Sequence, residues 1–152
     1  MKKNIIIFGL LLISVSLYAQ SKMVKYIDEC INLIGKSVPR DYIRGNRTIY
    51  YKTYEIDYIT IVLVVNNGIV NISSLGASFD TTHEAAIWLS QFYDIFESKD
   101  WQYDNYNSNM TGLDVYKKGG IYICIDAGSR REDGMIVNTI YFVKNINDLL
   151  SL

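Results

Sequence analysis

Two segments of the chain repeat apolar residues at the spacing of an α-helix. The first, residues 22–36, ends at Gly35, a residue suited to stop a helix. Its apolar positions are Val24, Ile27, Cys30, Ile31 and Ile34. The second, residues 81–97, begins with Thr81 and Glu84 at the spacing of a capping box. Its apolar stripe consists of Ala85, Trp88, Leu89, Phe92, Ile95 and Phe96. We therefore expect two amphipathic helices.

Six further segments are rich in β-branched and aromatic residues, which favour strands. They lie near 47–54, 57–66, 69–76, 113–117, 120–127 and 135–144. Asn67-Gly68, between the second and third segments, is a strong hairpin signal. The central strands place apolar residues at alternate positions, so these share one face: Ile59, Ile61, Leu63 and Ile121, Ile123, Ile125. The sequence predicts an α+β fold in which both helices cover this Ile face of a mainly antiparallel sheet of about six strands.

The opposite face of the sheet should be more polar and richer in tyrosine. Alternation assigns to it Tyr58 and Thr60, then Tyr122, Cys124 and Asp126. Antiparallel sheets commonly have one solvated face, so we expect this face to be open or covered by a partner. The polar residues 97–112 are predicted to form a loop, and residues 145–152 fit either a short helix or a frayed end.

The order helix, three strands, helix, three strands indicates a possible tandem αβββ repeat over 22–76 and 81–144. Three short matches support duplication: Tyr51-Lys52 with Tyr116-Lys117, residues 58–61 with 122–125, and residues 69–71 with 136–138. The matches occur in the same order in both halves, as a repeat requires. Two unrelated meanders rich in Ile and Tyr would also produce such matches.

The N-terminal residues have the form of a signal peptide. Lys2 and Lys3 precede an apolar run that is shorter than the roughly 20 residues of a membrane span. We expect residues 1–19 to be removed after Ala19, leaving a single α+β domain over 20–152 that is exported, periplasmic or secreted, with no stable membrane span. An uncleaved anchor is the alternative, because Leu17 is larger than the residue a strict cleavage site places there.

The two cysteines, Cys30 and Cys124, invite the prediction of a disulfide in an exported protein. However, Cys30 lies in the first predicted helix, whereas Cys124 lies on the strand face opposite the Ile face. Sulfur atoms on different sides of a sheet cannot meet. We therefore expect no Cys30–Cys124 bridge.

The sequence contains no recognisable catalytic motif. His83 is the single histidine, which excludes metal sites that need two histidines. The Asp- and Asn-rich residues 100–112 lack the glycine and glutamate positions of a calcium-binding EF-hand loop. We expect no catalytic residues, no metal and no cofactor.

Clusters of tyrosine, tryptophan and arginine indicate a binding function instead. The segment 39–54 interleaves basic and aromatic residues, and exposed aromatics often serve binding. The expected binding residues are Arg44, Arg47, Tyr50, Tyr58, Trp101, Tyr103 and Tyr122. Removing Lys2 and Lys3 leaves 13 basic against 16 acidic side chains, so nucleic acid is not an expected partner.

The predicted function is therefore that of an exported binding protein whose partner is a protein or a glycan in the cell envelope. The alternative is a small envelope hydrolase. Its site would use carboxylates such as Asp57, Asp114 or Asp126, at the separation that a pair of catalytic acids requires.

Overall fold

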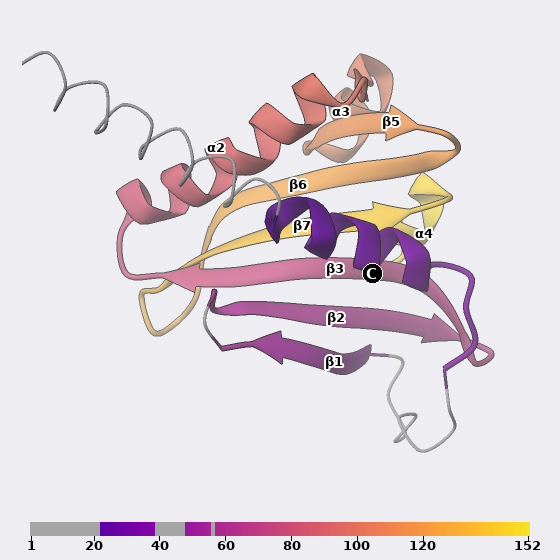
Figure 1. The fold of residues 1–152 in the computed structure, drawn as a ribbon, viewed down its shortest axis with the longest axis horizontal. Coiled ribbons are helices and arrows are strands. Elements are labelled where there is room, and N and C mark those ends of the chain that lie inside the picture. The colour runs from indigo at the N-terminus through magenta and orange to yellow at the C-terminus, as the bar shows by residue number, and fades with distance from the viewer. Residues whose placement is uncertain (1–21, 39–47, 56) are drawn as a thin grey trace, which may run out of the picture.

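A computed structural model of the protein describes residues 22–38, 48–55 and 57–152, and the chain forms one antiparallel sheet with helices on both faces (Figure 1). The strands are β1 (Thr48–Tyr54), β2 (Ile59–Asn66), β3 (Ile69–Phe79), β4 (Gln102–Tyr103), β5 (Asp114–Lys118), β6 (Ile121–Arg130) and β7 (Ile136–Val143). The helices are residues 22–33, α2 (Thr82–Ser98), α3 (Asn105–Thr111) and α4 (Ile146–Leu150). The predicted α+β class is confirmed. No described helix is long and apolar enough to cross a bilayer.

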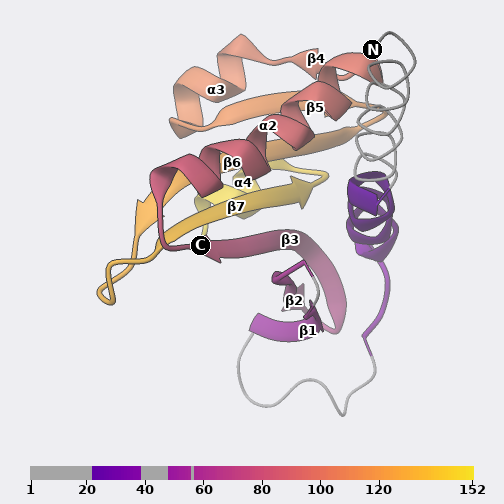
Figure 2. The same ribbon diagram turned by 60° about the vertical axis from the view of Figure 1, so that its left-hand side comes forward.

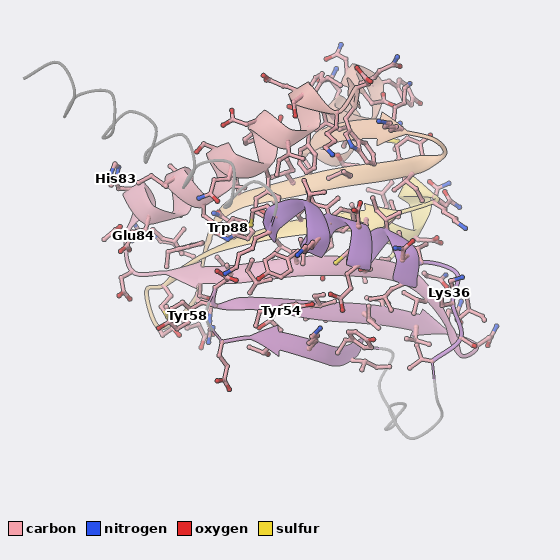
Figure 3. All side chains as sticks on the ribbon, viewed as in Figure 1. Lys36, Tyr54, Tyr58, His83, Glu84 and Trp88 are labelled. Atoms are coloured by element: carbon pink, nitrogen blue, oxygen red, sulfur yellow. The ribbon has the colours of Figure 1, made fainter. Side chains whose placement is uncertain are left out.

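The Ile face of the sheet is covered by helix 22–33 and α2, as predicted (Figures 1 and 2). Ile59, Ile61 and Ile123 are completely buried beneath them. Every residue of the apolar stripe predicted for α2 is buried. Figure 3 places Trp88 between α2 and helix 22–33. The larger apolar core of the protein therefore lies between these two helices and the sheet.

The local signals that begin and end these elements act as the sequence indicates. Thr81 caps α2: its Oγ1 accepts a hydrogen bond from the Glu84 N–H at 3.2 Å and donates one to Glu84 Oε2 at 2.9 Å. Helix 22–33 is followed by Gly35 at φ +79°. Asn67 (φ +51°) and Gly68 (φ +79°) form the tight turn between β2 and β3, with both residues in the left-handed region that this turn type needs.

The face opposite the Ile face is open only in part, which corrects the prediction. A second apolar cluster there joins Val115 and Cys124 of the sheet to Ile146 and Leu149 of α4. The polar segment predicted to be a loop contains α3 and the short strand β4. Asp104 initiates α3 by accepting a hydrogen bond from the Asn107 N–H at 3.1 Å, and Gly112 (φ +74°) ends it. These two capping residues favour a helix here although the segment has no apolar stripe.

The strand order is β1-β2-β3-β7-β6-β5-β4, so the two long central strands β3 and β7 pair with each other. Each three-strand meander, β1 to β3 and β5 to β7, runs from an outer position to the centre of the sheet. Within each meander the strands follow the same order from the outside to the centre. The tandem repeat stays a prediction.

The two cysteines are free and buried, and they lie on opposite faces of the sheet. Cys30 belongs to the core beneath helix 22–33, and Cys124 belongs to the cluster beneath α4. The prediction of no bridge is confirmed, for the reason given by strand alternation. Burial raises the pKa of each thiol to about 12, so both remain protonated at neutral pH.

Two irregularities alter the paired strands. In β1 the register shifts between Tyr50 and Lys52, which leaves Tyr51 as an extra residue opposite β2. In β6 the register shifts between Asp126 and Ser129, next to the hairpin that leads into β7. The N–H of Gly128 in this second bulge donates to Asn138 Oδ1 at 2.9 Å, and Asn138 Nδ2 donates to the carbonyl of Ala85 in α2 at 2.8 Å. A single buried amide thus joins the bulge to the helix.

Candidate functional site

The part of the sheet that α3 and α4 leave uncovered forms a groove of about 480 Å³. Its floor is a row of small residues that strand pairing aligns across β1, β2, β3 and β7: Thr53, Thr60, Gly76 and Thr139. Val62 and Ser74 form the adjoining row. Because helix 22–33 and α2 lie in front of the sheet in Figure 1, the groove lies on the far side in that view.

Gly76 leaves the centre of the groove floor without a side chain. A Cβ added there would stand 3.9 Å from the Thr60 carbonyl oxygen and 4.0 Å from that of Asn138, both ordinary contacts. The backbone of Gly76 has no positive φ. A larger residue would therefore fit the strand and protrude into the groove, which makes Gly76 a position at which the groove can be filled without disturbing the sheet.

Longer side chains stand around this floor. Arg131 and Met135 come from the β6–β7 hairpin, and Tyr58 comes from the turn between β1 and β2. The Arg131 guanidinium contacts Asp133 at 3.1 Å within the same hairpin. The groove thus combines methyl and hydroxyl groups on its floor with an aromatic ring, a thioether and a cation along its margin.

Tyr58 has an unusual combination of backbone strain and exposure. Its φ is +52°, in the left-handed region that costs a residue with a bulky side chain about 1 kcal/mol or more. Its side chain does not recover this cost by burial, because Tyr58 is 78% exposed. In Figure 3 it lies at the end of the sheet, well separated from Tyr54. Neither backbone preference nor burial therefore accounts for a tyrosine at this position.

The residues predicted for binding do not converge on one site. Tyr58 lines the groove, but Tyr122 is half-buried near α3 and α4 on another part of the same face. Trp101 packs edge-on against Phe96 of the helix layer, with ring centroids 6.1 Å apart. Tyr103 lies in the edge strand β4 and donates a hydrogen bond to Asp114 at 3.4 Å.

The basic and aromatic segment contributes little to the described site. Arg44 and Arg47 lie outside the described residues. Tyr50 lies in β1, in register with Val62 of the groove, and the structure describes its backbone only.

The three carboxylates considered for a hydrolase are each bound to different partners. Asp57 accepts from Lys22 Nζ at 3.2 Å and from the Tyr26 hydroxyl. Asp114 accepts from the Tyr93 hydroxyl at 2.6 Å. Asp126 accepts from Ser129 at 3.0 Å on the opposite face of the sheet. No described contact joins any two of these carboxylates.

Sequence reasoning missed most of the groove. Alternation assigns Thr60 to the correct face, but Gly76 and Thr139 become its neighbours only through the pairing of β3 with β7. These two strands are about 60 residues apart in the chain, and a shift of one residue in register would turn either strand over. Small residues at alternate positions on the face opposite the Ile face were the available signal.

Comparisons with protein families, curated proteins and solved structures find no significant match to this chain. The function must therefore be argued from the groove and its surroundings.

Proposed function

We propose that the chain is an exported binding protein that holds an extended segment of a protein partner in the groove on its open sheet face. The observation that supports this most strongly is Tyr58, which is 78% exposed in a disfavoured backbone conformation at the margin of a floor of small residues. Exposed tyrosines are enriched where proteins bind one another, because one ring provides both apolar area and a hydroxyl.

The chemistry of the floor fits an uncharged polypeptide better than a charged ligand. Thr53 and Thr60, whose Oγ1 atoms share a hydrogen bond at 3.3 Å, and Thr139 offer hydroxyl groups that can bond to the amide groups of a peptide. Their methyl groups, together with Val62 and Val137, offer apolar contact for side chains. Arg131 supplies the positive charge at the margin, and it is already paired with Asp133.

Export is supported by the N-terminal sequence. Lys2 and Lys3 followed by a short apolar run are typical of a secretory signal. On this proposal the partner lies in the cell envelope or outside the cell. No contact among the described residues favours the hydrolase, since its three carboxylates are engaged separately.

Site-specific photo-crosslinking tests the proposal. A photoreactive amino acid at Thr60 or Thr139 should form an adduct with a protein partner in the cells that express the chain, whereas the same group at Ile87, exposed on α2, should not. Gly76→Val fills the floor and should abolish the adduct. Tyr58→Gly should reduce it at least about tenfold, the loss expected for a central aromatic at an interface.

Thermal unfolding of each variant provides the control for folding. Adducts that are equally strong at Ile87, or that persist in Gly76→Val, would contradict the groove as the binding site. An adduct that contains glycan and no peptide would show that the partner is a glycan and not a protein.

A further inference from the structure

Helix α3 has the reverse of the usual distribution of polar and apolar residues. Its one buried residue is Ser108, whereas Tyr106 is 76% and Met110 is 44% exposed. A buried polar residue together with exposed large apolar residues is informative, because folding alone favours the opposite arrangement. The large side chains of α3 therefore do not serve the core.

The polar residues of α3 fix the helix to the sheet. Ser108 Oγ accepts a hydrogen bond from the Val115 N–H of β5 at 2.9 Å. The Asp104 N–H donates to the Val115 carbonyl at 2.7 Å, and the Asp104 carboxylate contacts Lys117 Nζ at 3.3 Å. The hydrogen bonds from Asn107 and the nearby Lys117 lower the pKa of Asp104, so this anchor stays ionised at neutral pH. Tyr106 and Met110 are thus held in place by a firmly attached helix.

These two side chains line a surface pocket of about 320 Å³ between α3 and α4. Tyr122 of β6 contributes a second aromatic ring, and Asn107, Asn145 and Asn147 contribute three side-chain amides. The pocket is near the lower end of the size range for small-molecule sites. It is separate from the groove that contains Gly76, with which it shares no lining residue.

The amides retain hydrogen-bonding groups for a ligand. Asn107 Nδ2 donates to Asp104 Oδ2 at 2.9 Å. The Oδ1 atom of Asn107 accepts no hydrogen bond from the described residues, so it can accept one from a ligand. Asn145 Oδ1 accepts from the Asn147 N–H at 3.1 Å, which leaves its Nδ2 as a donor. The site therefore offers both donors and acceptors, the combination that a hydroxyl group requires.

The charge of the pocket favours a neutral ligand. Among the residues that the structure describes, Lys144 is the one charged residue that lines it. Its Nζ stands 3.4 Å from the position of a Cβ built on Gly35, beyond the end of helix 22–33. The ammonium group of Lys144 is thus close to Gly35. No carboxylate or guanidinium group from the described part of the chain lines the pocket.

We propose that the pocket between α3 and α4 binds a neutral sugar ring, as a second site independent of the groove. A sugar has an apolar C–H face that can pack on the ring of Tyr106 and hydroxyl groups that can bond to the three asparagine amides. Such a ligand needs both aromatic contact and paired amide contacts, and this pocket provides both with no carboxylate or guanidinium group among its described lining residues.

Titration of the ¹⁵N-labelled protein, produced from the full chain, tests this inference. The probes are diacetylchitobiose, maltotriose and cellotriose at millimolar concentrations, with a neutral tripeptide as the comparison ligand. We expect at least one saccharide to shift the side-chain amide resonances of Asn107, Asn145 and Asn147. Tyr106→Ala should weaken this binding about tenfold, whereas Tyr106→Phe, which keeps the ring, should change it less than threefold.

Ile87→Ser, on the distant exposed side of α2, is the matched control and should leave saccharide binding unchanged. Because Tyr106 is mostly exposed, Tyr106→Ala should also leave the melting temperature unchanged. The inference is overturned if no saccharide shifts these amides, if the tripeptide shifts them and the saccharides do not, or if Tyr106→Ala binds as well as the original protein. The two proposals can fail separately, because the groove and this pocket share no lining residue. Absence of saccharide binding would leave the groove proposal intact, and the Gly76→Val result tests the groove alone.

Discussion

Tyr58 and Ile61, three residues apart, represent the two ways in which this chain uses large side chains. Ile61 is completely buried on the Ile face, where its value to the fold is the apolar surface it removes from water. Tyr58 is exposed and its backbone conformation disfavours folding. Stability therefore accounts for Ile61 but not for Tyr58.

Substitution of these two residues should separate stability from binding. Ile61→Ala should lower the free energy of unfolding by about 2 to 5 kcal/mol, because it creates a cavity in a packed core. Tyr58→Gly should change it by less than about 1 kcal/mol, since relief of the left-handed conformation offsets the entropy that glycine gains in the unfolded chain. Chemical denaturation of both variants measures the difference. A loss in Tyr58→Gly as large as that in Ile61→Ala would mean that the Tyr58 ring belongs to the core.

The sequence predicts burial residue by residue better than it predicts the site. Alternation correctly assigns Ile59 and Ile61 to the covered face, because both the pattern and the burial depend on neighbours in the same strand. Gly76 carries no comparable signal. Its importance depends on Thr60 and Thr139, which lie beside it in the sheet but far from it in the chain.

At the scale of elements, tyrosine hydroxyls and carboxylates attach the covering helices to the sheet. Tyr26 of helix 22–33 donates to Asp57, and Tyr54 of β1 donates to Glu29 of the same helix. The rings of Tyr26 and Tyr54 are themselves in contact, with centroids 4.5 Å apart. The helix and the β1–β2 hairpin are thus joined by two hydrogen bonds, and each of them supplies the donor of one bond and the acceptor of the other.

A third hydrogen bond of this kind fixes α2. The Tyr93 hydroxyl donates to Asp114 of β5 at 2.6 Å. Burial first, and then the bond to the carboxylate, raise the pKa of Tyr26, Tyr54 and Tyr93 above the ordinary value. Each bond requires a protonated hydroxyl, so all three are lost when the tyrosines ionise.

The attachment of the helices should therefore weaken at alkaline pH. A tyrosine whose pKa is raised on folding contributes stability that is fully present below its unfolded pKa of about 10 and is lost as the pH rises towards the folded value. We expect the free energy of unfolding in urea to fall steadily above about pH 10. The part of the tyrosinate absorbance that comes from these three residues should appear together with unfolding.

The control is the triple variant Tyr26→Phe, Tyr54→Phe and Tyr93→Phe, in which this fall should be smaller. Some dependence should remain, because burial also raises the pKa values of Cys30, Cys124, Tyr116 and Tyr141. An unchanged alkaline profile in the triple variant would show that the hydrogen bonds do not stabilise the helices.

The elements that the sequence predicts best are those with long periodic patterns. The stripe from Ala85 to Phe96 identifies α2, and its capping residues fix its first turn. Helix α3 was missed because it has seven residues and only Ser108 faces the core, so it lacks apolar periodicity. Asp104 and Gly112 at its two ends were the signals that could have revealed it.

At the scale of the whole molecule, one core unites both halves of the chain. The cluster on the Ile face contains Ile27 and Ile61 from the first half together with Phe92 and Phe142 from the second. The pairing of β3 with β7 joins the two meanders at the centre of the sheet. Neither half therefore has an apolar core of its own on this face.

Unfolding should accordingly be a single cooperative transition. Fluorescence of Trp88 and Trp101 reports on the second half, whereas far-ultraviolet circular dichroism reports on the whole chain. We expect the two signals to give the same midpoint in urea, and Ile61→Ala in the first half to shift both equally. Separate midpoints would indicate that the halves fold as independent units.

The two outermost strands of the sheet bear on how the protein avoids aggregation. An exposed, regular strand offers its unpaired backbone groups as a template to other molecules, and fibres grow by this route. At one margin β4 has only two residues, too few to serve as such a template. At the other, the extra residue Tyr51 interrupts β1 midway, and the charged Lys52 follows it. We therefore expect both margins of the sheet to resist the strand-to-strand pairing between molecules that leads to amyloid.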